Sequence, residues 1–458
     1  MLKRIIKKII PPALLRFYHF LLAFFAAVLY QFPSQKIKVI GVTGTNGKTT
    51  VINLTAKILE EAGIKVASLS SINFKIGAKE WKNDLKMTMP GRFLIQKFLR
   101  TAVDEKCQYA ILEVTSEGIS QHRHRFINFD AAVFTNLSPE HIEAHKGFEN
   151  YRAAKGRLFQ AAKNIHIINI DDGNAEYFLQ FPAKDKIGYT IFSPNQSYRY
   201  PISIIEALNC QETADGISFS VRDIIFNLKL LGEFNIYNTL AAICVGLSQG
   251  ISLEICKKAL EKIEGIPGRM EKVISDPFKV FVDYAFTPNA LEQVYQTLNP
   301  AKRDESKNIH SSSSFAILGQ TKKRTQFSSP NVDQKLPSTK LICVLGACGG
   351  GRDKWKRPVL GKIAAKYCSE IIVTNEDPYD EDPMDIINQV ASGASGKAKK
   401  ILDRREAIQE SLKSAKPGDV VVVTGKGCEP WICLKGGKKI PWDDRQIVRE
   451  EFQKLKID

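Results

Sequence analysis

A glycine-rich segment near residue 45 has the residue types and spacing of a phosphate-binding loop. Residues 41–50 read GVTGTNGKTT, so that Lys48 and Thr49 directly follow a glycine. In such loops the backbone amides surround phosphate oxygens, the lysine contacts the β- and γ-phosphates, and the hydroxyl ligates Mg²⁺. The strict pattern requires a glycine at position 42, where this chain has Val42. The loop is therefore a variant form, and it predicts binding of ATP or GTP.

The segments around this loop are typical of a strand and a helix. The β-branched run KIKVIGVTG predicts a buried strand, and residues 49–62 predict the helix after it. Further short apolar runs alternate with helical stretches, at KVASLSS, YAILEVTS, AAVFTNLS and IHIINI. This alternation predicts an α/β fold with a parallel, doubly wound sheet.

A second αβ series follows a helical stretch that ends at GIPGR. Its strands are predicted at KVFVDYA, LICVLGA, EIIVTN and DVVVVTGKG. We therefore divide the chain into a hydrophobic, basic N-terminal segment (1–35), a phosphate-loop central domain (36–268) and a Rossmann-like C-terminal α/β domain (269–458). Residues 301–340, which are rich in serine and charge, are interpreted as a flexible insertion on the surface.

The net charge of +16 would suit a nucleic-acid-binding protein, but its distribution along the chain does not. Residues 1–38 hold seven Lys or Arg side chains and no Asp or Glu, and residues 301–340 hold eight against three. The rest of the chain is nearly neutral, which is typical of an enzyme and predicts no nucleic-acid partner. The nine cysteines include no CxxC pair and complete no zinc set, so we interpret them as reduced thiols of a cytoplasmic protein.

The N-terminal segment combines basic residues with a short apolar stretch. Residues 20–30 are fully apolar, whereas a span across a bilayer needs about 20 such residues. The sequence AVLYQFPSQ offers a poor cleavage site for a signal peptide. Two interpretations remain open: a helix packed on the body of the protein, and a helix in peripheral contact with the inner face of the membrane.

Several ordered motifs resemble those of the Mur ligases, which have the folylpolyglutamate synthases as relatives. The loop has the family's form GxTGTNGKT, and the resemblance continues along nearly the whole chain from about residue 37. The matching segments, in order, are EVTSEGISQHR, FTNLSPEHIEAHKGFENYRAAKGRLF, LLGEFNIYNTLAA, GIPGRMEKV, VDYAFTPNALE, GACGGGRDKWKRPVLG and VTGKGCEPW. The GGGRDKWKRP block is most similar to that of the members that add the third peptide residue in peptidoglycan synthesis.

The resemblance implies an ATP-dependent ligase that forms a peptide bond through an acyl phosphate. Its substrates would be a UDP-MurNAc-dipeptide-like acceptor and a diamino acid. Such chemistry needs charge neutralisation and positioning rather than covalent help from the protein. The catalytic residues implied by the matches are Lys48, Glu113, His141 and Lys155. The metal ligands would be Thr49, Glu113, His141 and, if carbamylated as in most of the family, Lys155.

The same matches assign residues to the three substrates. The ATP contacts would be Gly44, Thr45, Asn46, Gly47, Lys48, Thr49, Thr50, Asn238, Arg269 and Asp283. The nucleotide-sugar peptide would meet Thr88, Thr115, Gln121 and Arg123. The incoming amino acid would meet Arg352, Glu376, Asp377, Tyr379, Gly425 and Glu429.

Some positions depart from the family's pattern. Only about 35 residues precede the loop strand, where family members carry a UDP-binding domain of roughly a hundred residues, so a lipid-linked acceptor is an open alternative. Enzymes specific for diaminopimelate read DNPR, whereas this chain reads Glu376-Asp377-Pro378-Tyr379. A phenol cannot replace a guanidinium that pairs with a carboxylate, so lysine or another diamino acid fits as well. Glu117, Phe286 and Cys428 replace three family histidines.

Other functions remain as alternatives to the third-residue ligase. The first is a related enzyme that acts on another carboxylate, either a folylpolyglutamate synthase-like ligase or an amidating ligase of lipid II. The second is a non-catalytic ATP-binding scaffold, which would not need two metal sites. We expect a monomer, with the active site in the cleft between the two α/β domains.

Overall fold

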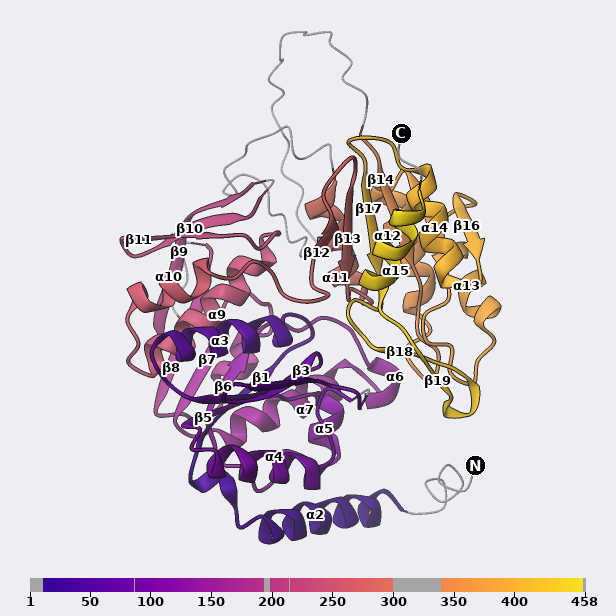
Figure 1. The fold of residues 1–458 in the computed structure, drawn as a ribbon. Helices are drawn as coiled ribbons and strands as arrows, with labels where there is room; N and C mark the ends of the chain where they lie inside the picture. The colour runs from indigo at the N-terminus through magenta and orange to yellow at the C-terminus, as the bar shows by residue number, and fades with distance from the viewer. Residues whose placement is uncertain (1–10, 86, 193–197, 214, 300–338, 456–458) are drawn as a thin grey trace.

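Two separate β-sheets organise the chain, one in each half (Figure 1). The computed structural model describes residues 11–455 except 86, 193–197, 214 and 300–338. Most of the expected insertion at 301–340 therefore lies outside the described residues. The α/β fold class with a parallel-rich sheet and a second C-terminal sheet is confirmed.

The first sheet has eleven strands in the order β11-β10-β9-β8-β7-β6-β1-β5-β2-β3-β4. Its strands from β9 to β2 in that order pair in parallel. The bounds of the strands are β1 (Lys38–Thr43), β2 (Val66–Leu69), β3 (Asn73–Ile76), β4 (Lys79–Lys82), β5 (Tyr109–Glu113), β6 (Phe129–Phe134), β7 (Ile165–Asn169), β8 (Asp185–Thr190), β9 (Ser203–Glu212), β10 (Ile217–Val221) and β11 (Ile224–Leu228).

Helices cover both faces of this sheet. Alternate residues of β1 point to opposite faces, so Ile40 and Val42 join one buried cluster and Val39 joins the other. The first face is covered by α3 (Lys48–Glu61), α9 (Phe234–Ser248) and α10 (Leu253–Glu261). The second face is covered by α4 (Arg92–Asp104), α7 (Phe148–Ala161) and α8 (Ala175–Leu179), while α5 (Ser116–Ser120) and α6 (Ile142–His145) lie near the strand ends.

The antiparallel parts of this sheet were not predicted. Strands β9, β10 and β11 form a meander at one edge, and β3 and β4 form a hairpin at the other. Every residue of β4 is exposed, and β9 has only two buried residues. Polar residues interrupt β3, β4 and β9, so these strands lack the continuous apolar runs that mark the central strands.

The second sheet has the order β12-β13-β17-β14-β15-β16. The four strands predicted in this half are all present and parallel, and β12 adds an antiparallel edge. The elements are β12 (Glu271–Ile274), β13 (Lys279–Asp283), α11 (Pro288–Leu298), β14 (Leu341–Leu345), α12 (Lys356–Tyr367), β15 (Glu370–Thr374), α13 (Pro383–Ser392), β16 (Ala398–Ile401), α14 (Arg404–Ser414), β17 (Val420–Thr424), the ribbon β18 (Trp431–Cys433) and β19 (Lys439–Pro441), and α15 (Asp444–Lys454).

The described part of the N-terminal segment forms the helix α2 (Pro12–Leu29), followed by the short helix η1 (Pro33–Gln35). One face of α2 packs against α4, with Ala23, Ala26 and Ala27 buried. The interpretation as a helix packed on the body of the protein is thereby confirmed for that face. Among the described residues, no helix has both the length and the apolar character needed to cross a membrane.

Candidate active site

The predicted phosphate loop lies between β1 and α3, as its flanking sequences indicated. Gly47 has a φ of 82°, and a Cβ atom there would lie 2.2 Å from Oδ1 of Asn238. A side chain at this position would collide with α9, so glycine is required for the close approach. The backbone amide of Asn46 donates a hydrogen bond to Oδ1 of Asn136 at 2.9 Å, which holds this part of the loop in place. The backbone geometry fits a loop that surrounds phosphate oxygens.

Two lysines reach this loop from different helices. Nζ of Lys48 donates to the carbonyl oxygens of Gly44 and Thr45 at 3.1 and 2.8 Å. Nζ of Lys155, on α7, donates to the same oxygen of Gly44 at 2.6 Å. Burial lowers the pKa of Lys48, and burial together with the charge of Lys48 lowers the pKa of Lys155 well below its ordinary value. Burial therefore disfavours the charged form of both lysines, and more strongly that of Lys155.

A buried carboxylate stands beside the loop, at the carboxyl end of β5. Oε2 of Glu113 accepts hydrogen bonds from Oγ1 of Thr49 and from the amide of Ser71, both at 2.9 Å. Its Oε1 lies 3.9 Å from Nζ of Lys48. A carboxylate and a hydroxyl are the oxygen ligands that Mg²⁺ prefers, so this pair fits the expected cation. Ser71 was not predicted, because nothing in its own sequence surroundings marks it.

His141 faces the same cleft from the residue before α6. Its Nδ1 lies 3.7 Å from Oε1 of Glu117. Burial, reinforced by the charges of Arg352 and Lys155, lowers the pKa of His141 to about 2. The imidazole is therefore neutral at physiological pH, which is the form that ligates metals.

The residues expected to meet the nucleotide line one wall of this cleft. Asn238 lies on α9 and donates to Oδ1 of Asn235 at 2.9 Å. The guanidinium of Arg269 stacks 4.4 Å from the centre of the Tyr284 ring. Asp283 accepts from two backbone amides at 2.6 Å, and burial raises its pKa. In this structure Asp283 thus shapes the chain at the end of β13.

The residues expected to bind the acceptor gather around α5. Thr88, Thr115 and Arg123 line the cleft. Gln121 does not line the cleft, but its Oε1 accepts a hydrogen bond from Nη2 of Arg123 at 2.8 Å. Gln121 therefore positions the Arg123 guanidinium, and its side chain is not among those that face the cleft.

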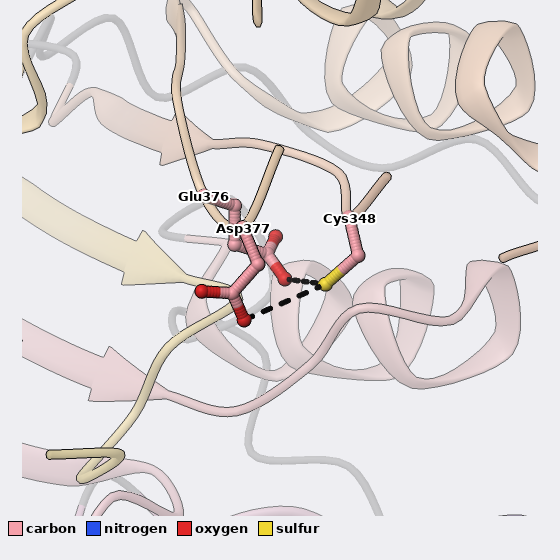
Figure 2. Close-up of side chains that lie close together, drawn as sticks. All are labelled: Cys348, Glu376 and Asp377. Carbon is pink, nitrogen blue, oxygen red and sulfur yellow. Dashed lines mark hydrogen bonds between the residues drawn. The ribbon is translucent and has the colours of Figure 1, made fainter. Parts of the chain in front are cut away.

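The amino-acid side of the cleft holds a group of three acidic or thiol side chains (Figure 2). Sγ of Cys348 donates to Oε1 of Glu376 at 2.7 Å, and Oδ2 of Asp377 lies 4.0 Å from the same sulfur. Both oxygens of Asp377 also accept from Nζ of Lys426 at 3.0 Å. The potential ligand atoms of the three residues lie within 4.8 Å of one another. Burial and the two carboxylates raise the pKa of the thiol, so its proton is retained for the hydrogen bond to Glu376.

Glu376 differs from Asp377 because one oxygen of its carboxyl group is not hydrogen-bonded. The side chain is buried and lines the cleft, and its Oε2 has no hydrogen-bond partner among the described residues. Burial and the nearby Asp377 raise the pKa of Glu376. Asp377 was expected to contact the amino acid, but its carboxylate is engaged with Lys426 and with the amide of Cys433. Cys348 and Lys426 were not predicted, although Arg352 and Glu429 were assigned from the same two segments.

The other residues expected on this side take different positions. Arg352, Tyr379 and Glu429 line the cleft. Gly425 does not line it, but its φ is 106° and a Cβ there would lie 2.5 Å from Oε2 of Glu376. Gly425 therefore leaves room for the Glu376 side chain.

Direct contacts hold the two α/β halves together across the cleft. Nζ of Lys356, on α12, donates to Oε1 of Glu140 at 2.6 Å, and both side chains are 3% exposed. The carboxylate of Asp353 accepts from the amides of Ile142 and Glu143, both at 3.1 Å. None of these pairs was predicted, because their members are more than 200 positions apart in the chain.

A phosphate loop on one wall and a charged pocket on the other suit an ATP-dependent ligase that joins a carboxylate to an amine. Residues 42–246 match the Mur ligase middle domain, and residues 328–427 match the Mur ligase, glutamate ligase domain. The chain belongs to the Mur ligase family.

Individual relatives agree with this assignment. A UDP-N-acetylmuramoyl-L-alanyl-D-glutamate–2,6-diaminopimelate ligase of Syntrophomonas wolfei is 38% identical, over 94% of this chain and 81% of the relative. A UDP-N-acetylmuramyl-tripeptide synthetase of a Roseiflexus species is 33% identical, over 95% and 82%. A solved structure of a diaminopimelate ligase of the same description has 29% identity and a TM-score of 0.56, over 91% and 78%. A folylpolyglutamate synthase of Mycobacterium tuberculosis, at 17% identity and a TM-score of 0.63 over 87% and 91%, shares the fold.

Proposed function

We propose that this enzyme adds the third peptide residue, a diamino acid, to UDP-N-acetylmuramoyl-L-alanyl-D-glutamate in peptidoglycan synthesis. The named relatives carry this activity in their descriptions, and their similarity covers more than nine-tenths of the chain. The observation that supports it most is that one cleft is lined both by Lys48, Glu113 and His141 and by Arg352 and Glu376. We also propose the division into residues 36–268 and 269–458, which agrees with one sheet in each part.

Each residue has a role in the two substitutions that the reaction requires. A carboxylate oxygen of the acceptor attacks the γ-phosphate of ATP and ADP leaves; the amine of the amino acid then attacks the acyl carbon and phosphate leaves. Lys48 and the amides of the loop bind the transferred phosphoryl group. Thr49 and Glu113 would hold one Mg²⁺ and His141 a second, which supply charge neutralisation when bound. Thr88, Thr115 and Arg123 orient the acceptor, with Gln121 behind the guanidinium.

The pocket favours an amino acid whose distal group is a cation. The unpaired Oε2 of Glu376 offers an acceptor for an ammonium group, whereas the carboxylate of Glu429 already accepts from Tyr284 and Lys426. Tyr379 cannot form the bidentate pair through which a guanidinium binds a second carboxylate. These contacts support lysine or ornithine over diaminopimelate.

Some finer properties belong to the same proposal. The lowered pKa of Lys155 favours the neutral amine that carbon dioxide must attack, which supports carbamylation at its Nζ. The carbamate would then join His141 in holding a second Mg²⁺. We expect the enzyme to act as a monomer in the cytoplasm, where ATP is available.

Phosphate release from ATP tests the proposal directly. The protein is incubated with UDP-N-acetylmuramoyl-L-alanyl-D-glutamate and with lysine, ornithine, diaminopimelate or no amino acid. Release that depends on lysine or ornithine supports both the reaction and the role of Glu376. Release that depends on diaminopimelate alone supports the reaction and refutes the cation pocket. Protein that binds ATP but releases no phosphate with any amino acid refutes the proposed acceptor.

A further inference from the structure

The outer face of α2 presents apolar side chains that the ligase reaction does not use. We call this face the α2 stripe: Leu14, Phe17, Tyr18, Phe25, Val28 and Leu29, which are between 47% and 64% exposed. With Phe20 and Phe24, they are eight of the eighteen large hydrophobic side chains exposed among the described residues. Their spacing of three and four residues places them on one side of the helix. Most soluble proteins do not expose so continuous an apolar surface without a partner for it.

The inner face of α2 fixes the direction in which the stripe points. Ala23, Ala26 and Ala27 are buried, and α2 contacts α4 along the outside of the central domain (Figure 1). The rings of Phe20 and Phe24 lie 5.2 and 5.5 Å from that of Phe126. Since one side of the helix is attached to the body, the opposite side faces outward. The helix can therefore lie flat on a surface with its stripe buried in it.

Basic residues precede α2 in the sequence and lie beside it on the body of the protein. The first acidic residue of the chain is Glu60, and Lys3, Arg4, Lys7 and Lys8 precede the helix in the sequence. Beside the helix, His122 has a pKa lowered by burial and by four arginines, which are Arg125, Arg157, Arg92 and Arg16. The guanidinium of Arg92 contacts α2 directly, with its Nη2 3.0 Å from Nδ1 of His19. This concentration of guanidinium groups complements anionic phosphate headgroups.

We propose that α2 docks the enzyme onto an anionic lipid surface, with the α2 stripe at the acyl boundary and the neighbouring arginines at the level of the phosphates. Aromatic side chains such as Phe17, Tyr18 and Phe25 are suited to this interfacial depth. A second copy of the chain is a poorer occupant. A symmetric contact through this face would bring two like-charged arginine clusters together.

The docking surface adjoins the acceptor end of the cleft. Arg92 donates to the carbonyl oxygen of Gln121 at 2.6 Å, and the side chain of Gln121 accepts from Arg123, which lines the cleft. Docking would therefore hold the acceptor site close to the lipid headgroups. This last point rests on the proposed function, whereas lipid binding itself does not.

Flotation with lipid vesicles tests the proposal. Wild-type protein is mixed with vesicles of phosphatidylcholine alone and with vesicles that contain about 30 mol% phosphatidylglycerol. We expect binding to the anionic vesicles only, and a fall of about tenfold or more in the partition coefficient for Phe25→Asp. Ile225→Asp is the matched control, because Ile225 and Phe25 are both 56% exposed and Ile225 lies on the edge strand β11. Arg16→Glu tests the electrostatic part and is expected to weaken binding as well.

Several outcomes would overturn the proposal. Failure of the wild type to float with anionic vesicles is one, and equal binding by Phe25→Asp and Ile225→Asp is another. Sedimentation that shows a dimer for the wild type and a monomer for Phe25→Asp, without vesicle binding, would assign the face to a second copy. ATP binding by each variant verifies that it is folded. Phosphate release with a soluble acceptor is measured separately, so failure to bind vesicles and failure of the ligase reaction remain distinguishable.

Discussion

The buried pair of Lys356 and Glu140 makes the contact between the two halves of the enzyme testable. Nζ of Lys356 lies 2.6 Å from Oε1 of Glu140, and the ammonium also lies 5.0 Å from the centre of the Phe286 ring. Oε2 of Glu140 has no hydrogen-bond partner among the described residues, and burial raises the pKa of this carboxyl. Lys356→Met keeps the length of the side chain and removes the charge that offsets that of Glu140.

The expected cost follows from the burial of both partners. Removing one member of a buried ion pair leaves an uncompensated charge and typically costs about 3–5 kcal/mol. Because the pair joins α12 to the segment before α6, this cost falls on the contact between the two halves rather than on either sheet. We expect activity to require the halves in this arrangement, so a cost of about 3 kcal/mol corresponds to a loss of about 150-fold in kcat/KM.

A double-mutant cycle separates this effect from simple damage. Phosphate release is measured for Lys356→Met, for Glu140→Gln and for the two changes together. We expect each single variant to lose activity. The double variant has no unpaired charge, so its kcat/KM is expected to lie no more than about tenfold below that of the better single variant, or above it. If the losses in activity of the two single variants add, with a coupling free energy near zero, this pair does not hold the two halves in their active arrangement.

Other residues yield further predictions. Lys155→Ala is expected to lower kcat by about a thousandfold or more, while an ATP titration shows that binding is retained, because Nζ of Lys155 contacts the phosphate loop at Gly44. Unchanged turnover would refute its catalytic role. Gly425→Ala is expected to raise KM for the amino acid by about tenfold or more without changing KM for ATP, since its Cβ would lie 2.5 Å from Oε2 of Glu376; equal changes in both would contradict this. Burial lowers the pKa of His124 from 6.5 to about 3, so unfolding takes up a proton below pH 6.5 and stability is lost as the pH falls. Urea unfolding of His124→Gln is expected to show a pH dependence shallower by up to about 1.4 kcal/mol per pH unit between these values, and identical slopes would exclude this histidine as the cause.

The sequence predicted the parts of the molecule that depend on local pattern. Buried parallel strands such as β1, β5 and β17 are continuous apolar runs, and the loop before Lys48 has its own spacing. Edge strands such as β3, β4 and β9 were missed because polar residues interrupt their apolar ones. In the cleft, Glu113 and His141 were found through ordered motifs. The pairing of Asp377 with Lys426, the thiol of Cys348 and the bond between Lys356 and Glu140 depend on how distant segments meet, which spacing along the chain does not encode.

The thiol of Cys348 has a consequence for chemical labelling of the cleft. The thiol donates a hydrogen bond to Glu376, and the pKa of the thiol is raised. The reactive thiolate is therefore scarce at neutral pH. General alkylating reagents are therefore expected to react slowly. A ligand whose ammonium group draws Glu376 away would remove the negative charge that suppresses ionisation. An electrophile attached to such an amino acid would thus increase the reactivity of its own target as it binds, which is the property sought in a selective covalent inhibitor.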